Sequence, residues 1–362
     1  MEKVFDSHVH YSFEIPLEET IAIFREEFKA TGTEKYAFMS LPHHANDYGT
    51  AVTFDDMQNI KGAYLKHVFS PNAHTFAGLE HPLEETDKKK YADNLLKQAE
   101  EYMAAGFDGF KMLEGYPSMR KAMKMPLCDE AYDKYYSFLE ENNVPVTMHI
   151  ANPEENWDSM KVSEYARKVG RYCDSTYPTK AELHAEVDAI MKKHPRLRLA
   201  LAHYGFLTYN IKDARRFLDD YENTVLDITP GGEQYFNMLK DWDTWHEFFV
   251  QYQDRIVYGT DFYAFPKDEK WEENFKRRTN FVRQFFETDT EHLYIDKTFR
   301  GIKLEESIRK KIYFDNAVRE LGEPKKMNVA YMIKKAEELL LKPTHKSENA
   351  EKDLKFILEN LK

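Results

Sequence analysis

Short apolar runs alternate with segments of helical periodicity along most of this chain. Eight runs have the length and composition of buried β-strands: Val4–His10, Tyr36–Leu41, Thr75–Leu79, Gly109–Leu113, Val144–Ile150, Arg198–His203, Thr224–Ile228 and Ile256–Asp261. The clearest helical segments between them are Leu17–Phe28, Lys88–Ala105, Asp129–Asn142, Lys180–His194, Ile211–Tyr221 and Asn237–Tyr252. Repeated alternation of strand and helix predicts a parallel sheet closed into a (β/α)8 TIM barrel, an α/β fold.

The turn after the first predicted strand separates this barrel from its main rival. An open doubly wound sheet would carry a glycine-rich phosphate-binding turn at that place. Here the turn reads SHVHYSF and contains no glycine. A long connection, Ala151–Pro178, follows the fifth predicted strand. Connections of that length are usually functional, so we expect this loop to shape a binding site.

The chain beyond Asp261 is charged and mostly helical in pattern. We expect Lys303–Leu321 to contain the helices that close the barrel, which gives a barrel domain over residues 1–321. Residues 322–362 hold two amphipathic segments, Asn328–Leu341 and Ala350–Leu361, joined by a polar stretch. They predict a C-terminal helical appendage that packs on the barrel, with a dimerisation element as the alternative.

Composition and charge exclude several classes of protein. The 362 residues are 42% hydrophobic and 31% charged, which is enough apolar material for a core. No apolar run approaches the roughly 18 residues that span a membrane. The formal net charge of -12 disfavours nonspecific nucleic-acid binding. Cys128 and Cys173 lack CxxC spacing, and the N-terminal MEKVFDSHVH lacks a signal-peptide pattern, so we expect a cytoplasmic protein without a disulfide framework.

Five polar residues stand at the carboxyl ends of predicted strands. His8 and His10 lie in FDSHVH. His149 ends VPVTMH, His203 ends LRLALAH, and Asp261 follows RIVYGT. In a barrel these strand ends meet at one face, where active sites are built. Residues i and i+2 of a strand share a face, so His8 and His10 place two imidazoles side by side. Four imidazoles and a carboxylate predict a transition-metal site.

Each of these residues alone has a plainer interpretation. In a chain with 14 histidines an HxH motif arises easily by chance, and a lone histidine after a strand is usually a satisfied polar residue. Asp261 could cap the turn that follows it, although no helix start is evident there. The occurrence of all five residues at the same end of the predicted strands favours a functional site.

Lys111 lies near the end of the fourth predicted strand, in GFDGFKMLEG. It could contact an anionic group of the substrate, bridge two metal ions after carbamylation, or lie on the surface. Glu114 is an alternative acidic ligand or a loop residue. Further candidates are Tyr11 and Asn152 as substrate contacts. One of His43, His44 and His74 could line the pocket, although a surface role is the plainer interpretation of each.

The motifs DSHVH, MHI, AHYG and YGTDF, followed by YFDNAVREL, resemble the amidohydrolase superfamily over residues 1–321. Within it, the chain resembles the branch that includes the aminocarboxymuconate-semialdehyde and γ-resorcylate decarboxylases. The resemblance implies a distorted (β/α)8 barrel with one divalent metal, commonly zinc. It implies that the metal ligands are His8, His10, His149 and Asp261. It also implies that His203 acts near the metal-bound water as a general acid/base or electrophile, and we take Asp261 as a second candidate catalytic residue.

These features together predict an enzyme that attacks a small polar substrate with a metal-activated water and hydrolyses an amide, lactone or ester bond. A non-oxidative decarboxylase of an aromatic or unsaturated carboxylic acid is the alternative, and a non-catalytic metal- or ligand-binding barrel is a third interpretation. Manganese or iron could replace zinc, and a binuclear site with Lys111 is a further alternative. We expect a small-molecule substrate, no nucleic-acid or membrane partner, and a homodimer as the commonest assembly.

Overall fold

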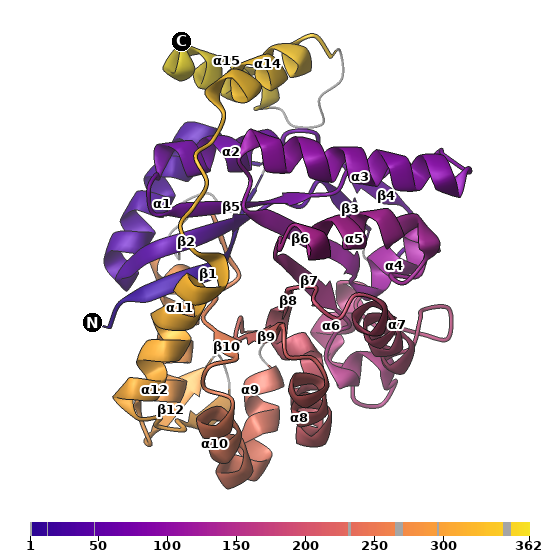
Figure 1. Cartoon of the computed structure of the whole chain (residues 1–362). Coiled ribbons are helices and arrows are strands. Elements are labelled where there is room, and N and C mark those ends of the chain that lie inside the picture. Colours follow the sequence, from indigo (N-terminus) through magenta and orange to yellow (C-terminus); the bar gives the residue numbers. More distant parts are fainter. Residues whose placement is uncertain are drawn as a thin grey trace.

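A parallel sheet surrounded by helices forms the body of the molecule (Figure 1). The computed structural model describes residues 2–12, 14–46, 48–230, 233–264, 271–294, 297–342 and 349–362. The sheet has nine strands in the order β10-β9-β8-β7-β6-β5-β2-β1-β11. Their bounds are β1 Val4–Tyr11, β2 Thr33–Met39, β5 Ala73–Gly78, β6 Gly109–Gly115, β7 Val146–Ile150, β8 Leu199–Leu201, β9 Thr224–Asp227, β10 Ile256–Val257 and β11 Phe262–Ala264.

The two ends of this strand order close on each other. β10 and β11 are successive segments of one stretch of chain, residues 256–264, and β10 pairs with β9 while β11 pairs with β1. Between the two segments, Ser7 N donates to Tyr258 O at 3.0 Å and Asp261 N donates to His8 O at 2.9 Å. The sheet is therefore a barrel whose eighth strand is interrupted near its carboxyl end. This confirms the predicted (β/α)8 fold, and each predicted strand overlaps a strand of the sheet, although β8 and β10 end before His203 and Asp261.

Helices cover the outside of the barrel and link successive strands (Figure 1). The longer ones are α1 Leu17–Thr31, α2 Gln58–Val68, α3 Lys88–Ala105, α5 Asp133–Glu141, α7 Lys180–Lys193, α8 Ile211–Asp220, α10 Trp242–Gln251 and α11 Trp271–Glu287. The sequence pattern does not predict α2, whose buried residues include Lys61 and Lys66. Because α2 lies between the sheet and the C-terminal helices, it lacks the polar face that an amphipathic pattern requires.

Short elements fill the connections between strands and helices. Two antiparallel hairpins pair β3 His43–Ala45 with β4 Val52–Phe54, and β12 Glu291–Tyr294 with β13 Lys297–Arg300. The sequence pattern predicts neither hairpin, because strands of three or four residues are too short to show a period. Short helices are α4 Pro117–Met123, α6 Glu164–Lys168 and α9 Glu233–Met238. The long loop Ala151–Pro178 contains α6 and a 3-10 turn at Glu154–Trp157.

The chain that follows α11 closes the amino end of the barrel. It forms α12 Glu306–Lys310, a π-helical turn at Lys311–Asp315 and α13 Asn316–Leu321, which occupy the predicted closing segment. Asn316 Nδ2 donates to Gln253 O and to Ile256 O, both at 2.7 Å. Tyr258 N donates to Ile312 O at 2.9 Å. These bonds anchor the eighth strand just before the interruption that carries Asp261.

The C-terminal hairpin consists of α14 Val329–Leu340 and α15 Ala350–Leu361, which pack against each other and over α2 and α1 (Figure 1). Lys61 Nζ and Asp353 Oδ2 form an ion pair of 2.7 Å between α2 and α15, with both side chains almost fully buried. Asp353 Oδ1 accepts a hydrogen bond from Leu17 N at 2.8 Å, at the start of α1. Both helices match predicted segments, and the domain boundary at residue 321 stays a prediction.

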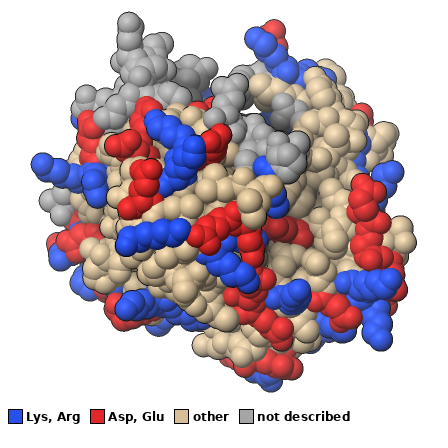
Figure 2. Space-filling view, turned by 90° about the horizontal axis from the view of Figure 1, so that it is seen from above, with Lys and Arg blue, Asp and Glu red and all other residues tan. Residues whose placement is uncertain are grey.

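The surface carries charges of both signs. Figure 2 shows acidic and basic side chains interspersed over the described part of one face. Cys128 is exposed and Cys173 is buried, both as free thiols. Within the described ranges, no helix combines the length and the apolar character that crossing a membrane requires.

Candidate metal centre

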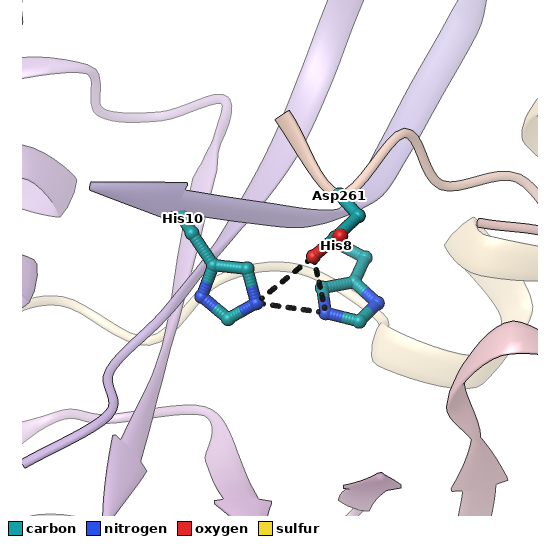
Figure 3. A group of neighbouring side chains, drawn as sticks. All are labelled: His8, His10 and Asp261. Atoms are coloured by element: carbon teal, nitrogen blue, oxygen red, sulfur yellow. Dashed lines mark hydrogen bonds and ion pairs between the residues drawn. The ribbon is translucent and has the colours of Figure 1, made fainter. Parts of the chain in front are cut away.

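Three predicted ligands gather at the carboxyl end of the strands. His8 and His10 lie on β1 with 0% and 3% exposure, and Val9 between them points to the opposite face of the strand. Asp261 lies in the interruption between β10 and β11, next to β1. Figure 3 shows the three side chains pointing toward one another. The pairing of β1 with the eighth strand therefore positions all three.

The distances between these side chains define a compact group. His8 Nε2 lies 3.0 Å from His10 Nε2. Asp261 Oδ1 lies 3.3 Å from His10 Nε2 and 3.7 Å from His8 Nε2. Among the residues that the structure describes, this is the one group of three histidine, cysteine or acidic side chains whose ligand atoms all lie within 4.8 Å of one another. Two nitrogens and one oxygen thus face a common point.

The far ring nitrogens fix the protonation of both imidazoles. His8 Nδ1 lies 2.5 Å from Asp227 Oδ2. His10 Nδ1 lies 3.1 Å from Met39 O. Both partners are acceptors, so each Nδ1 carries the hydrogen and each Nε2 carries a lone pair. Burial lowers the pKa of His8 and His10 well below the usual value, which keeps both rings neutral. Neutral imidazole is the form that binds a metal ion.

A cation holds Asp261 as a carboxylate. Arg278 on α11 donates to Asp261 Oδ2 at 3.0 Å and to Asp261 O at 2.6 Å. Burial alone would raise the pKa of Asp261, but the positive charge of Arg278 outweighs burial and holds this pKa well below its usual range. Asp261 Oδ1 is left to face His8 and His10. Two neutral imidazoles and one carboxylate are a donor set that fits zinc, manganese or iron.

Lys111 reaches the same group from β6. Its Nζ donates to His8 Nε2 at 2.9 Å, and its side chain is buried. Burial lowers the pKa of Lys111 to about 8, although nearby carboxylates oppose this shift. As an ammonium, Lys111 competes with a metal ion for the lone pair of His8. Its position agrees with the predicted contact to substrate, which stays a prediction.

His203 and His149 lie beside this group without joining it. The ring centre of His203 lies 5.7 Å from that of His8 and 4.9 Å from that of His149. His203 Nδ1 donates to Thr229 O at 3.2 Å, which leaves the lone pair on Nε2. His149 Nε2 donates to Ala151 O at 3.1 Å, which leaves the lone pair on Nδ1. The ligand role of His149 and the catalytic role of His203 stay predictions.

Comparison with sequence models of protein families identifies the family of this chain. A sequence model of the amidohydrolase family matches residues 87–322, more than half of the chain. The chain belongs to the amidohydrolase family. The matched span contains His149, His203 and Asp261, whereas His8 and His10 precede it. No protein with a curated description matches the chain.

Solved structures similar to this amidohydrolase share its fold. An uncharacterised TIM-barrel protein from Bordetella bronchiseptica has a TM-score of 0.55 at 14% identity, with 88% of this chain and 98% of the other covered. A 4-oxalomesaconate hydratase from Rhodopseudomonas palustris has a TM-score of 0.51 at 15% identity, with 88% and 95% covered. A 2,6-dihydroxybenzoate decarboxylase from Rhizobium has a TM-score of 0.51 at 17% identity, with 88% and 98% covered. At these identities the likeness concerns the fold alone.

Left-handed backbone conformations concentrate around the site of this amidohydrolase. Asp261 has a φ of 53° and Ala151, directly after β7, has a φ of 62°. His203 begins four consecutive residues with φ between 53° and 58°, of which Gly205 is the one glycine. Such a conformation costs a non-glycine residue roughly 1–3 kcal/mol and persists only where the surrounding structure enforces it. Strain of this kind is typical of the strand ends that carry a functional site.

The two other predicted substrate contacts of the amidohydrolase have different surroundings. Tyr11 lies on β1 opposite the face of the histidines, and its hydroxyl lies 2.6 Å from Ser40 Oγ and donates to Gln58 O at 2.8 Å. These bonds place the Tyr11 hydroxyl in the layer between the sheet and α2, and the contact of Tyr11 with substrate stays a prediction. Asn152 follows β7 and is buried. Its contact with substrate stays a prediction.

Sequence reasoning misses two residues of the site. Asp227 ends β9 and binds His8, and burial raises the pKa of Asp227 to about 6. A signal for Asp227 exists, because it is a carboxylate near the end of the predicted strand Thr224–Ile228. Arg278 has no such signal, since it lies in a charged helix without a motif and meets Asp261 only in the folded chain.

Proposed function

We propose that this chain is a metal-dependent hydrolase that cleaves an amide, lactone or ester bond of a small polar substrate. The observation that carries the proposal is the convergence of two imidazole lone pairs and one carboxylate oxygen. His8, His10 and Asp261 would hold one divalent ion, zinc in the first instance, with His149 as the further proposed ligand. When bound, such an ion would lower the pKa of a water molecule and polarise a carbonyl group.

His203 is the proposed proton-transferring residue. Its Nδ1 donates to Thr229 O, and its own carbonyl accepts from Gln234 Nε2 at 3.1 Å, so the ring and its backbone are both fixed. Burial lowers the pKa of His203, which keeps Nε2 free to accept a proton near neutral pH. Asp261 is the second proposed catalytic residue, because its Oδ1 faces the same space.

Turnover by matched histidine variants tests this role. Metal-loaded protein is assayed against a panel of amides, lactones and esters. His203→Asn should lower kcat by about 10²–10⁴-fold and leave the metal content unchanged, because the variant loses proton transfer and no ligand. His67→Asn, at an exposed histidine of α2, should behave as the wild type. Equal turnover by His203→Asn and the wild type would contradict the proposal.

A non-oxidative decarboxylase is the second candidate. Lys111 Nζ and the Arg278 guanidinium both contact the proposed ligands, and two such cations could hold a substrate carboxylate. The similar structures also include a 2,6-dihydroxybenzoate decarboxylase. Substrates with a labelled carboxylate, assayed in isotope-labelled water, separate the two reactions. Labelled carbon dioxide without uptake of water oxygen would support decarboxylation, and uptake of water oxygen into product would support hydrolysis.

The context of the enzyme is proposed on the sequence alone. We retain a cytoplasmic location, a small-molecule substrate and a homodimer as proposals. Light scattering coupled to size-exclusion chromatography measures the assembly directly. If metal binds stoichiometrically and no member of either substrate class is turned over, the non-catalytic metal-binding barrel replaces both enzyme proposals.

A further inference from the structure

A second buried polar cluster lies beside the proposed metal centre. Glu114 follows Lys111 on β6, and its Oε1 lies 2.5 Å from Nε2 of His81, in the connection between β5 and α3. His81 Nδ1 lies 2.8 Å from the hydroxyl of Tyr91 on α3. The carboxylate can only accept, so His81 Nε2 donates to Glu114 and His81 Nδ1 accepts from Tyr91. This chain of hydrogen bonds fixes the orientation of the Glu114 carboxylate.

The other oxygen of Glu114 is buried and unsatisfied. Glu114 Oε2 has no hydrogen-bond partner among the described residues, and the residue is 5% exposed. Such a group is costly to bury unless a donor reaches it. Glu114 lines a small cavity together with Lys111, Ser40 and Gly78. The cavity offers about 10 Å³ to the centre of a water molecule, which is room for roughly one water-sized group.

The two charged walls of this cavity select its occupant. Lys111 and Glu114 both line the cavity; the ammonium of Lys111 can only donate, and the unsatisfied Oε2 of Glu114 can only accept. An ammonium group cannot accept a hydrogen bond from Lys111, and a carboxylate group cannot donate one to Glu114. A hydroxyl group accepts and donates at once, and it is about the size of one water molecule.

We propose that the cavity between Lys111 and Glu114 is a subsite for a hydroxyl group of the substrate. The inference rests on the proposed function, because it assumes that substrate binds at the neighbouring centre of His8, His10 and Asp261. It adds a specificity element: Lys111 donates to the hydroxyl oxygen, and Glu114 accepts the hydroxyl hydrogen. His81 is a positioning residue that acts through Glu114.

Calorimetric titration of four probes into zinc-loaded protein tests the subsite without requiring turnover. The probes are benzoate and its 2-, 3- and 4-hydroxy derivatives, whose hydroxyl scans three positions relative to a carboxylate bound at the centre. In the wild type, at least one hydroxylated probe should bind about tenfold or more tightly than benzoate, because it satisfies Glu114 Oε2. Glu80→Gln is the matched control, since Glu80 bonds Tyr102 at 2.8 Å and does not line this cavity.

The substitution Glu114→Gln should abolish the advantage of the hydroxylated probe. His81 still requires an acceptor, so the Gln oxygen would face His81 and the amide N–H would face the cavity as a donor. Glu114→Asp keeps the charge but withdraws the carboxylate, and it should reduce the advantage as well. Because Glu114→Asp keeps the buried charge, it remains testable if Glu114→Gln fails to fold.

The outcomes separate the subsite from the proposed function. Equal affinity of the wild type for all four probes, no binding of any hydroxylated probe, or an unchanged advantage in both Glu114 variants would overturn the subsite. Failure of the wild type to retain zinc would overturn the proposed function instead. The same titration on zinc-free protein would then test the subsite by itself.

Discussion

Two buried charged clusters of this barrel differ in how their polar atoms are paired. At the junction of the C-terminal hairpin, Lys61 and Asp353 meet as cation and anion at 2.7 Å, and the second oxygen of Asp353 accepts from Leu17 N. At the proposed metal centre, His8 Nε2 and His10 Nε2 lie 3.0 Å apart, and both carry lone pairs. The Nδ1 hydrogens of the two rings are donated to Asp227 Oδ2 and Met39 O.

The difference separates a structural cluster from a functional one. Folding alone explains the junction, because each of its charges has a partner of opposite sign within the chain. Folding alone gains nothing from placing two lone pairs and a carboxylate oxygen around one point, because like partial charges repel. Lys111 relieves part of this repulsion by donating to His8. The centre is therefore arranged for a cation, and the junction is arranged for stability.

Breaking the junction should give the largest change in stability. Lys61→Met and Asp353→Asn should each lower the free energy of unfolding by roughly 3–5 kcal/mol. The first variant leaves the carboxylate of Asp353 buried without its cation, and the second leaves the ammonium of Lys61 buried without its anion. The double variant should recover most of the loss, since it removes both charges and Asn retains an acceptor for Leu17 N. Urea denaturation measures all three proteins. A double variant less stable than either single variant would show that the pair is not an isolated structural contact.

Substituting Asp227 should weaken the centre without altering its ligands. Asn can donate to His8 Nδ1 and so favour the tautomer in which Nε2 carries the hydrogen. Asp227→Asn should lower zinc affinity by about 10–100-fold, the usual effect of removing a partner that orients a ligand. Competition with a coloured chelator measures the affinity. Asp219→Asn, at a surface carboxylate that accepts from Tyr252, serves as the control and should bind zinc as the wild type does.

Acid should destabilise the metal-free protein in part through His43, which lies outside both clusters. Burial lowers the pKa of His43 to about 4 from a usual value of 6.5. The unfolded chain therefore binds the proton more tightly, so this contribution to stability is complete above pH 6.5 and declines as the pH falls toward 4. Between pH 7 and pH 5 the decline should be about 2 kcal/mol. Calorimetry on chelator-treated protein should show a smaller acid loss for His43→Gln, and an equal loss would contradict this assignment.

Removing Lys111 should strengthen metal binding by a smaller factor. Lys111→Met abolishes the ammonium that competes for His8 Nε2, so zinc affinity should rise roughly tenfold. The same chelator competition measures the change. Loss of zinc from Lys111→Met would instead support the alternative in which a carbamylated Lys111 is itself a ligand.

The sequence predicts the barrel well because strand ends and alternation are local properties. The spacing of His8 and His10 is enough to place both on one face of β1, and the position of Asp261 at the end of a run places it near them. A contact between residues of different elements leaves no pattern in the local sequence. The sequence therefore does not predict the contact of Arg278 with Asp261. Tyr11 directly follows His10 and therefore lies on the opposite face of β1, where its hydroxyl contacts Ser40, and its contact with substrate stays a prediction.

The C-terminal region also contains helices that the sequence predicts and packs on one that it does not. The amphipathic patterns of α14 and α15 predict both helices, because each has one face toward the barrel and one toward solvent. The sequence pattern does not predict α2, because α14 and α15 cover the face of α2 that would otherwise be polar. Burial imposed by distant parts of the chain is the information that a single sequence window lacks.

The metal content per chain shows whether His8, His10 and Asp261 hold an ion. Elemental mass spectrometry is applied to protein purified without chelator, as the wild type, His10→Ala and the control His67→Ala. We expect close to one transition-metal ion per chain in the wild type and in the control, and little metal in His10→Ala. Equal metal content in all three proteins, or none in the wild type after reconstitution, would contradict a metal centre at His8, His10 and Asp261.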